Sequence, residues 1–274
     1  MEVQIITVYC LCADLLSAMS HKENEQCQVS DAEIMTIGIV AALYFGGNYT
    51  LARMMLKEQG YIPGMIGKSR FSRRIHRVKH HFETLFNTLA EVWKEENEGD
   101  IYVVDTYPLP VCDNIRIPRC KLYQDECYRG YKSSKKRYFY GLKIHMMVTK
   151  EGRPVELFLT PGGLSDTKGL EFFEFELPSG SLVIGDKAYN YYLIEDLLDT
   201  KEIQLCPIRK KNSKRPLDGW IQFFQHHYRQ AAETAGSMIE RLLPKSIHAT
   251  SAPGLELKVA LFCLASSIRW LLPT

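Results

Sequence analysis

Ile101-Tyr102-Val103-Val104-Asp105 is a short β-branched run that ends on an aspartate. Ser181-Leu-Val-Ile-Gly-Asp186 repeats this arrangement further along the chain. Short apolar runs of this kind are typical of buried strands, whose terminal side chains lie at the edge of a sheet, where ligands bind. Two such carboxylates on neighbouring strands would repel one another, and divalent cations between them would relieve the repulsion. The simpler alternative is that each aspartate caps the turn that follows it.

The segments around these two runs predict a mixed sheet covered by helices. Residues 137–149 and 154–160 are two strand-like runs joined by Lys150-Glu-Gly-Arg153, which predicts a β-hairpin. The later segments predict a helix near 168–175, the strand that ends at Asp186, a helix over 191–200, a strand over 203–208 and a long helix from about 219. This order of strands, hairpin and helices indicates an α/β fold.

The first hundred residues predict helices instead. Ser30-Asp-Ala-Glu33 has the pattern of a capping box in front of an apolar run. Further helices are expected over about 50–59 and, after a turn rich in glycine, over about 68–97. An acidic stretch that contains a glycine ends this helical part. We therefore place a domain boundary there, between a helical region 1–100 and a sheet-containing domain 101–274.

The composition is that of a soluble globular protein. Of the 274 residues, 46% are hydrophobic and 24% are charged, and the net charge is only +2. Bulk charge therefore gives no argument for a nucleic-acid partner. The eight cysteines form no C-x-x-C pair, so their spacing does not predict a structural zinc site, and we expect reduced thiols. Charged residues interrupt the apolar segments near both ends, so we expect neither a signal peptide nor a membrane span.

A third candidate carboxylate, Glu233, lies in the predicted C-terminal helix. Arg229 is one helical turn before it, so the two side chains share a face. The neighbours of Glu233 are small, which would let this helix approach the sheet closely; they are Ala231, Ala232, Ala235 and Gly236. The alternative is an ordinary solvated, charged helix face.

Five segments resemble a known family. They are VVDTYPLPVCDNIRIPR, KLYQDECYRGYKSSKKRYFYGLKIH, PGGLSD, LVIGDKAYNYYLIEDLL and IRKKNSKRP. In this order they resemble the DDE transposases of bacterial insertion sequences, and specifically the nine-eight-two insertion-sequence family, over nearly the whole chain. The resemblance implies an RNase H-like catalytic domain, a mixed sheet flanked by helices, over 101–274. It also implies a helical DNA-binding region, similar to a helix-turn-helix, over 1–100.

The acidic triad of the family maps onto Asp105, Asp186 and, through the pattern R-x-x-x-E, Glu233. Three such carboxylates would hold two Mg²⁺ ions roughly 3.5–4 Å apart, and Mn²⁺ could substitute for Mg²⁺. One ion would activate water for attack on a phosphodiester, and the other would stabilise the leaving 3′-oxygen. The freed 3′-hydroxyl would then attack target DNA. His226 and Glu240 stand where the wider group often has Tyr and Lys, so Glu240 is a second candidate for the third carboxylate.

Basic residues gather in three clusters although the net charge is small. In the first, arginines at i, i+3, i+4 and i+7 share one face of a predicted helix, as in a helix that reads DNA. The other two clusters flank the proposed active site, where they would neutralise DNA phosphates. The residues expected to bind DNA are Arg70, Arg73, Arg74, Arg77, Lys135, Lys136, Arg137, Arg209, Lys210, Lys211 and Arg229. Solvated basic faces and solubilising loops are the alternatives.

These observations together predict a transposase that cuts double-stranded DNA at the terminal inverted repeats of its element and joins the ends to target DNA. Because two ends must be brought together, we expect a dimer or a higher oligomer in the DNA complex. We expect a cytoplasmic bacterial protein associated with the nucleoid. Two alternatives stay open: an RNase H-like nuclease without strand transfer, and a catalytically inactive relic that binds DNA through its basic helix.

Overall fold

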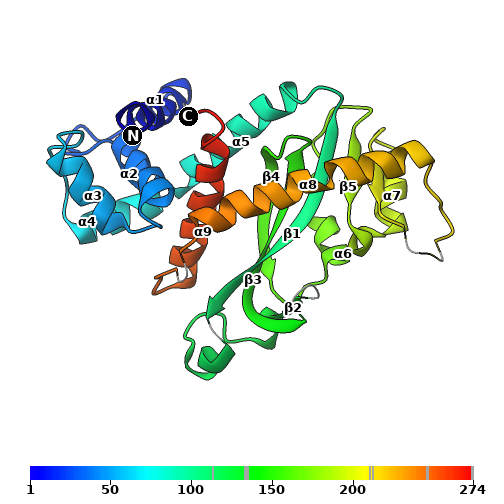
Figure 1. The fold of residues 1–274 in the computed structure, drawn as a ribbon. Helices are drawn as coiled ribbons and strands as arrows, with labels where there is room; N and C mark the ends of the chain where they lie inside the picture. The colour runs from blue at the N-terminus through cyan, green and yellow to red at the C-terminus, as the bar shows by residue number, and fades with distance from the viewer. Residues whose placement is uncertain (113, 133–135, 210, 212, 245–246, 273–274) are drawn as a thin grey trace. The chain divides into compact units, whose positions relative to one another are not determined.

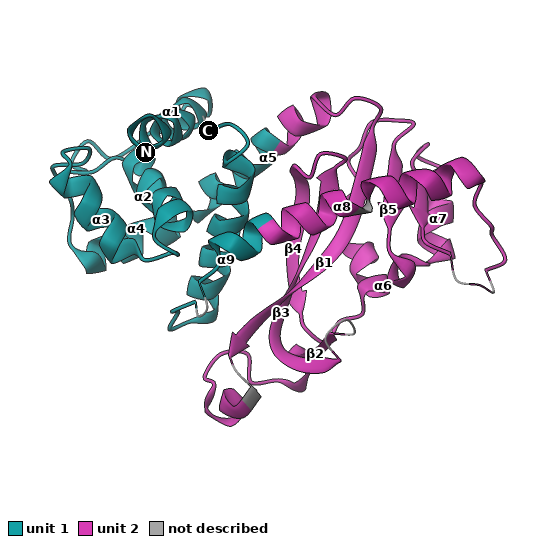
Figure 2. Ribbon diagram, in the orientation of Figure 1, with its two compact units in different colours: residues 1–89, 238–274 teal, residues 90–237 magenta. Residues whose placement is uncertain are grey.

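The computed structural model describes the chain except residues 113, 133–135, 210, 212, 245–246 and 273–274, and except the side chains of residues 114 and 229. The chain forms two compact units (Figure 2). The first consists of residues 1–89 and 238–274 and is called the helical unit; the second consists of residues 90–237 and is called the sheet unit.

Within the described residues, the sheet unit contains a mixed sheet of six strands (Figure 1). The strands are β1 (Ile101–Cys112), β2 (Arg129–Lys132), β3 (Arg137–Thr149), β4 (Pro154–Pro161), β5 (Leu182–Gly185) and β6 (Gln204–Pro207). Their order is β2-β3-β1-β5-β6, and β4 also pairs with β3. Strands β1, β5 and β6 are parallel, whereas β3 is antiparallel to β1, β2 and β4. This confirms the predicted mixed sheet, in the RNase H-like arrangement that the family resemblance implies.

Most other predicted elements of the sheet unit are confirmed, namely the β3–β4 hairpin and the helices α7 (Tyr192–Asp199) and α8 (Gly219–Leu242). The helix expected near 168–175 is shorter. It consists of α6 (Asp166–Gly169) and a 3₁₀ turn over Leu170–Phe172. The helix stops there because Phe173 takes an extended conformation that buries its ring against Phe158, with ring centres 4.7 Å apart.

The helical unit begins with four helices that lie before α5. The helices of this unit are α1 (Glu2–Ala18), α2 (Asp31–Tyr44), α3 (Tyr49–Glu58), α4 (Lys68–Arg77), most of α5 (Lys79–Glu95), the end of α8, and α9 (Ala252–Ile268). The capping box is confirmed, because Ser30 and Glu33 each accept the other's backbone N–H through their side chains. The helix expected over 68–97 is instead two helices, which are separated at the buried Val78.

Helices α2 and α9 form the core of the helical unit and are buried on nearly all sides. A helix that is apolar on all sides is stable only when other elements bury all of its sides. Residues 238–274 therefore pack with the N-terminal helices in one compact unit. The compact units therefore differ from a single division at residue 100. Gly47, with φ +74°, shows how close the packing is, because Phe262 lies 3.0 Å from where a Cβ would stand. Among the described residues no single helix is long and apolar enough to span a membrane, although the bent pair α2 and α3 could by length and composition alone.

Candidate active site

Asp105 and Asp186 come from neighbouring strands at one edge of the sheet. Strands β1 and β5 pair in parallel, and the last pair in their register is Val104 with Gly185. Asp186 directly follows β5, whereas Asp105 lies inside β1, which continues to Cys112 instead of ending at the aspartate as predicted. Both aspartates come directly after the last pair of the β1–β5 register, so the register brings them together, and we call them the strand-end aspartates after the end of this pairing. Asp105 is half-buried and Asp186 is exposed. Each carboxylate also accepts the N–H of the residue that follows it, at 2.7 and 2.6 Å respectively. Asp186 thereby caps the turn after β5, whereas the residue after Asp105 continues β1, so the turn-capping alternative does not apply to Asp105.

Buried side chains form a hydrogen-bonded chain directly beside Asp105. The hydroxyl of Thr106 lies 2.6 Å from the hydroxyl of Tyr189 and 3.2 Å from His145 Nδ1. His145 Nε2 lies 2.9 Å from the hydroxyl of Thr160. Burial, and then the charge of Asp105, raise the pKa of Tyr189 well above its ordinary value, so this hydroxyl keeps its proton. The chain ties β1, β3, β4 and the turn after β5 together, which fixes the backbone that carries both aspartates.

His145 is a structural histidine, because it is buried and both of its ring nitrogens take part in hydrogen bonds inside the core. The roles of Thr106 and Tyr189 were not predicted from the sequence. The signal for both is their position, because Thr106 follows Asp105 directly and Tyr189 lies one turn after Asp186. Residues that follow strand-end carboxylates so closely are placed to support them.

Lys143 and Asp166 form an ion pair in the same part of the sheet unit. Lys143 Nζ lies 2.8 Å from Asp166 Oδ1 and donates to the carbonyl of Leu164 at 2.7 Å. The charge of Asp166 also contributes to raising the pKa of Tyr189, after burial and Asp105. Asp166 begins α6, whose N-cap is Ser165. The carboxylate of Asp166 therefore pairs with Lys143 of β3, and Asp166 is also the first residue of α6.

Helix α8 packs closely against the sheet where Glu233 lies. A Cβ on Gly236 would stand 3.6 Å from the ring of Tyr107 in β1, and one on Gly152, in the β3–β4 turn, would stand 3.0 Å from the carbonyl oxygen of Ala231. The small residues thus allow the close approach that the sequence predicts. Glu233 is exposed and lies three residues before Gly236, on the same side of the helix.

The three predicted carboxylates are not a closed metal cluster. Among the described residues, the ligand oxygens of Asp105, Asp186 and Glu233 do not all lie within 4.8 Å of one another. The two strand-end carboxylates nonetheless offer hard oxygen ligands from rigid backbone, which is what Mg²⁺ requires. Glu233 belongs to the sheet unit with them, whereas Glu240 belongs to the helical unit.

Some arginines on the basic face of α4 are exposed, and one forms an ion pair inside the helical unit. Arg70, Arg73 and Arg77 are exposed. Arg74 instead points into the helical unit, where its guanidinium bonds the carboxylate of Asp31 and the carbonyl of Val29. The predicted face of four arginines is therefore a face of three, because Arg74 compensates a carboxylate that is only 4% exposed.

The two basic clusters of the sheet unit likewise contain both exposed side chains and a side chain that forms an ion pair within the fold. Lys136 and Arg137 are exposed at the start of β3, and Lys211 is exposed beyond β6. Arg209, which was expected to bind DNA, forms a two-pronged ion pair with the buried carboxylate of Glu195, at 2.7 and 2.9 Å. Of the other residues expected to bind DNA, Lys135, Lys210 and the side chain of Arg229 lie outside the described part of the chain.

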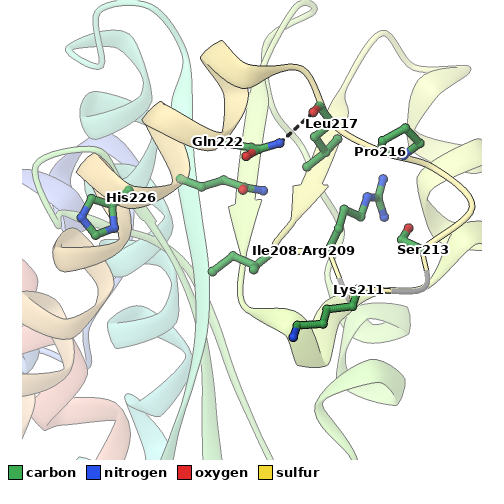
Figure 3. A pocket seen from close by; sticks show the side chains of 9 residues that line it. Ile208, Arg209, Lys211, Ser213, Pro216, Leu217, Gln222 and His226 are labelled. Atoms are coloured by element: carbon green, nitrogen blue, oxygen red, sulfur yellow. Dashed lines mark hydrogen bonds between the residues drawn. The ribbon is translucent and has the colours of Figure 1, made fainter.

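A pocket of about 410 Å³ opens beyond the end of β6 (Figure 3). Ile208 forms part of its wall and donates its N–H to the carbonyl of Gly185, so the pocket adjoins the strand that ends at Asp186. Lys211 and His226 contribute basic side chains to the lining. The pocket is therefore a polar, partly cationic hollow beside the strand that carries one of the two aspartates.

Residues 95–240 match the family model described as a transposase DDE domain. Among curated proteins, no sequence matches the chain. Three solved structures are similar at low identity. The first is a synaptic complex of piggyBac transposase with hairpin DNA, at 11% identity and a TM-score of 0.47, where the alignment covers 96% of this chain and 73% of that chain.

The other two structures contain the Mos1 transposase. The Mos1 mariner paired-end complex with Mn has 12% identity and a TM-score of 0.23, and the alignment covers 85% of this chain and 86% of that chain. The pre-cleavage Mos1 transpososome has 12% identity and a TM-score of 0.22, with 81% and 80% covered. The family match, however, spans more than half of the chain and includes both strand-end aspartates and Glu233, and the chain therefore belongs to the transposase DDE domain family.

Proposed function

We propose that this protein cuts DNA at the ends of a mobile element and joins the freed 3′-hydroxyl ends to target DNA. The observation that carries the proposal is the parallel register of β1 and β5, which ends with Val104 opposite Gly185 and so sets Asp105 beside Asp186. A hydrogen-bonded core beneath one of these carboxylates keeps the backbone rigid, as a catalytic site requires. The family match supports the same chemistry.

Asp105, Asp186 and Glu233 would hold the divalent metal ions in this proposal. Bound there, two Mg²⁺ ions, or Mn²⁺ in their place, would activate the attacking oxygen and stabilise the leaving 3′-oxygen. The two aspartates supply their oxygens from fixed strand ends, and Glu233 supplies its own from a helix that packs on β1 through Gly236. Lys211 beside the pocket would contact a DNA phosphate next to the scissile bond.

Exposed basic side chains would bind the DNA. They are Arg70, Arg73 and Arg77 on α4, with Lys136, Arg137 and Lys211 in the sheet unit. The partner is double-stranded DNA that carries the element's inverted repeats, and a dimer or higher oligomer would hold two ends together. The nine-eight-two insertion-sequence family, whose motifs the chain resembles, is the proposed subgroup, and the bacterial nucleoid is the proposed location.

The test first identifies the inverted repeats that a mobile element would carry on either side of the reading frame, and then measures cleavage of a DNA duplex with these repeats in Mg²⁺ or Mn²⁺. The wild type should leave a 3′-hydroxyl at the element end and, with added plasmid, should join that end to the plasmid. Asp186→Asn should lose both reactions. The matched control is Asp199→Asn, because Asp199 is an exposed aspartate at the end of α7 in the same unit.

Two results would contradict the proposal in different ways. Specific binding of the repeats without cleavage would identify an inactive DNA-binding relic. Metal-dependent cleavage without joining, under conditions in which the 3′-hydroxyl product persists, would identify a nuclease of the same fold.

A further inference from the structure

The loop between α1 and α2, together with the first residue of α2, brings three potential metal ligands together in the helical unit. The ligand atoms of His21, Glu23 and Asp31 all lie within 4.8 Å of one another. His21 Nε2 lies 3.0 Å from Asp31 Oδ2, and a carboxylate oxygen of Glu23 accepts the backbone N–H of Asp31 at 2.6 Å. The cluster is distinct from the strand-end carboxylates, because it lies in the other unit of the chain.

A fourth side chain, His81 at the start of α5, lies against this cluster. Its ring is 2% exposed, and neither of its nitrogens has a hydrogen-bond partner among the described residues. The ring packs edge-on against His21, with ring centres 4.6 Å apart. A buried polar atom without a partner destabilises the fold, so two such atoms in one ring require an explanation such as a bound ion.

We propose that His21, Glu23, Asp31 and His81 bind one zinc ion. Two imidazoles on one tetrahedral zinc, with Zn–N bonds of about 2.0–2.1 Å, have ring centres about 5 Å apart, close to the separation of His21 and His81. The mixture of imidazole and carboxylate donors favours zinc over Mg²⁺, which takes oxygen ligands. The hydrogen bond between His21 and Asp31 would give way to a bond from each residue to the ion.

Arg74 supports such a site from the α4 side. Its guanidinium binds Asp31 Oδ1, whereas His21 faces Asp31 Oδ2, so one carboxylate oxygen is held by the arginine and the other is directed at the cluster. Ligating carboxylates in metal sites are commonly held by such an outer hydrogen bond. The ion would link the α1–α2 loop to the start of α5 and, through Arg74, to the basic helix α4. The site would therefore stabilise the part of the chain that carries the exposed arginines.

The test uses the full chain with Asp105→Asn and Asp186→Asn, so that the strand-end carboxylates do not compete for metal. After removal of metal by a chelator, zinc alone is added back and its affinity is measured by competition with a chromophoric chelator. We expect one zinc ion per chain and a rise in the thermal unfolding midpoint. His81→Ala should weaken zinc binding by at least about 100-fold, because even outer-shell substitutions cost 10–100-fold. The matched control is His248→Ala, an exposed histidine of the same unit.

Because His81→Ala removes a buried ring, a milder variant accompanies it. Glu23→Gln keeps an oxygen that can accept the Asp31 N–H but loses the charge, so it should fold normally and still bind zinc at least about tenfold more weakly. Cobalt in place of zinc should give a tetrahedral spectrum without a thiolate band. The proposal is overturned if zinc does not bind, if His81→Ala and Glu23→Gln bind it like the control, or if cobalt reports thiolate ligands.

Discussion

The strand ends of the sheet unit and helix α4 of the helical unit both concentrate charges of one sign, but they do so by different means. In the sheet, backbone hydrogen bonds between β1 and β5 place Asp105 beside Asp186, although the two carboxylates repel one another. On α4 no backbone pairing fixes where the arginine side chains point. Arg74 binds Asp31 inside the helical unit, whereas Arg70 and Arg73 are exposed. Charges imposed by backbone register are suited to an external ion, whereas charges on a helix divide between holding the fold and binding a partner.

The largest expected effect lies at the strand ends and concerns the third carboxylate. Glu233→Gln should lower the rate of metal-dependent DNA cleavage by about 1,000-fold or more, because metal ions stabilise the transition state by several kcal/mol. Glu240→Gln should change the rate by less than about threefold, since Glu240 lies two helical turns, about 10 Å, further along α8 than Glu233. Rates are measured under single-turnover conditions with pre-cut and uncut element ends. Equal losses in both variants, or the larger loss in Glu240→Gln, would reassign the third ligand.

The next effect tests the inward arginine of α4. Arg74→Ala should lower the free energy of unfolding by about 3 kcal/mol, because it leaves a buried carboxylate without its main compensating charge. Burial on its own would raise the pKa of Asp31, but hydrogen bonds from Arg74 and His21 hold that pKa below its usual value. Arg73→Ala, one position away and exposed, should change stability by less than about 0.5 kcal/mol. Urea unfolding followed by circular dichroism compares the two, and equal midpoints would show that the ion pair does not stabilise the fold.

A pH effect of similar size is expected beneath the strand ends. Burial lowers the pKa of His145 to about 4, from 6.5 in the unfolded chain. Between these values the unfolded chain binds a proton that the folded chain does not, so the stability contributed at higher pH is lost as the pH falls from 6.5 towards 4, by up to about 3 kcal/mol. His145→Gln should flatten this part of the stability curve, whereas the exposed His248→Ala should not. Parallel curves for wild type and His145→Gln would contradict the assignment.

The parts of the molecule that could be predicted are those that local pattern determines. The runs before Asp105 and Asp186 predict buried strands, and strand pairing then sets the two carboxylates side by side without further information. The small residues around Glu233 likewise predict the close packing of α8 against β1. In both cases the sequence signal, an apolar run or a group of small residues, lies within a few residues of the site, although the surfaces that meet are distant in the sequence.

The parts that could not be predicted depend on partners distant in the sequence. Asp31 lies 43 residues before Arg74, and Glu195 lies 14 residues before Arg209, so helical spacing and charge density gave no sign of either ion pair. The position of α9 was missed for a related reason. The sequence of an apolar helix predicts that the helix is buried, but it does not identify the surface that buries it. Here α9 packs against α2.

The smallest expected effects concern the arginines that α4 leaves exposed, and they decide whether that surface binds DNA at all. Alanine at Arg70, Arg73 or Arg77 should each reduce the slope of log affinity against log salt concentration by about one, because each lost phosphate contact releases about one counterion fewer. The matched control is Lys57→Ala, an exposed basic residue on α3 of the same unit. Fluorescence anisotropy with element-end DNA over a range of salt concentrations measures the slopes. If all three arginine variants keep the wild-type slope, the outer face of α4 is a solvated surface that does not contact DNA phosphates.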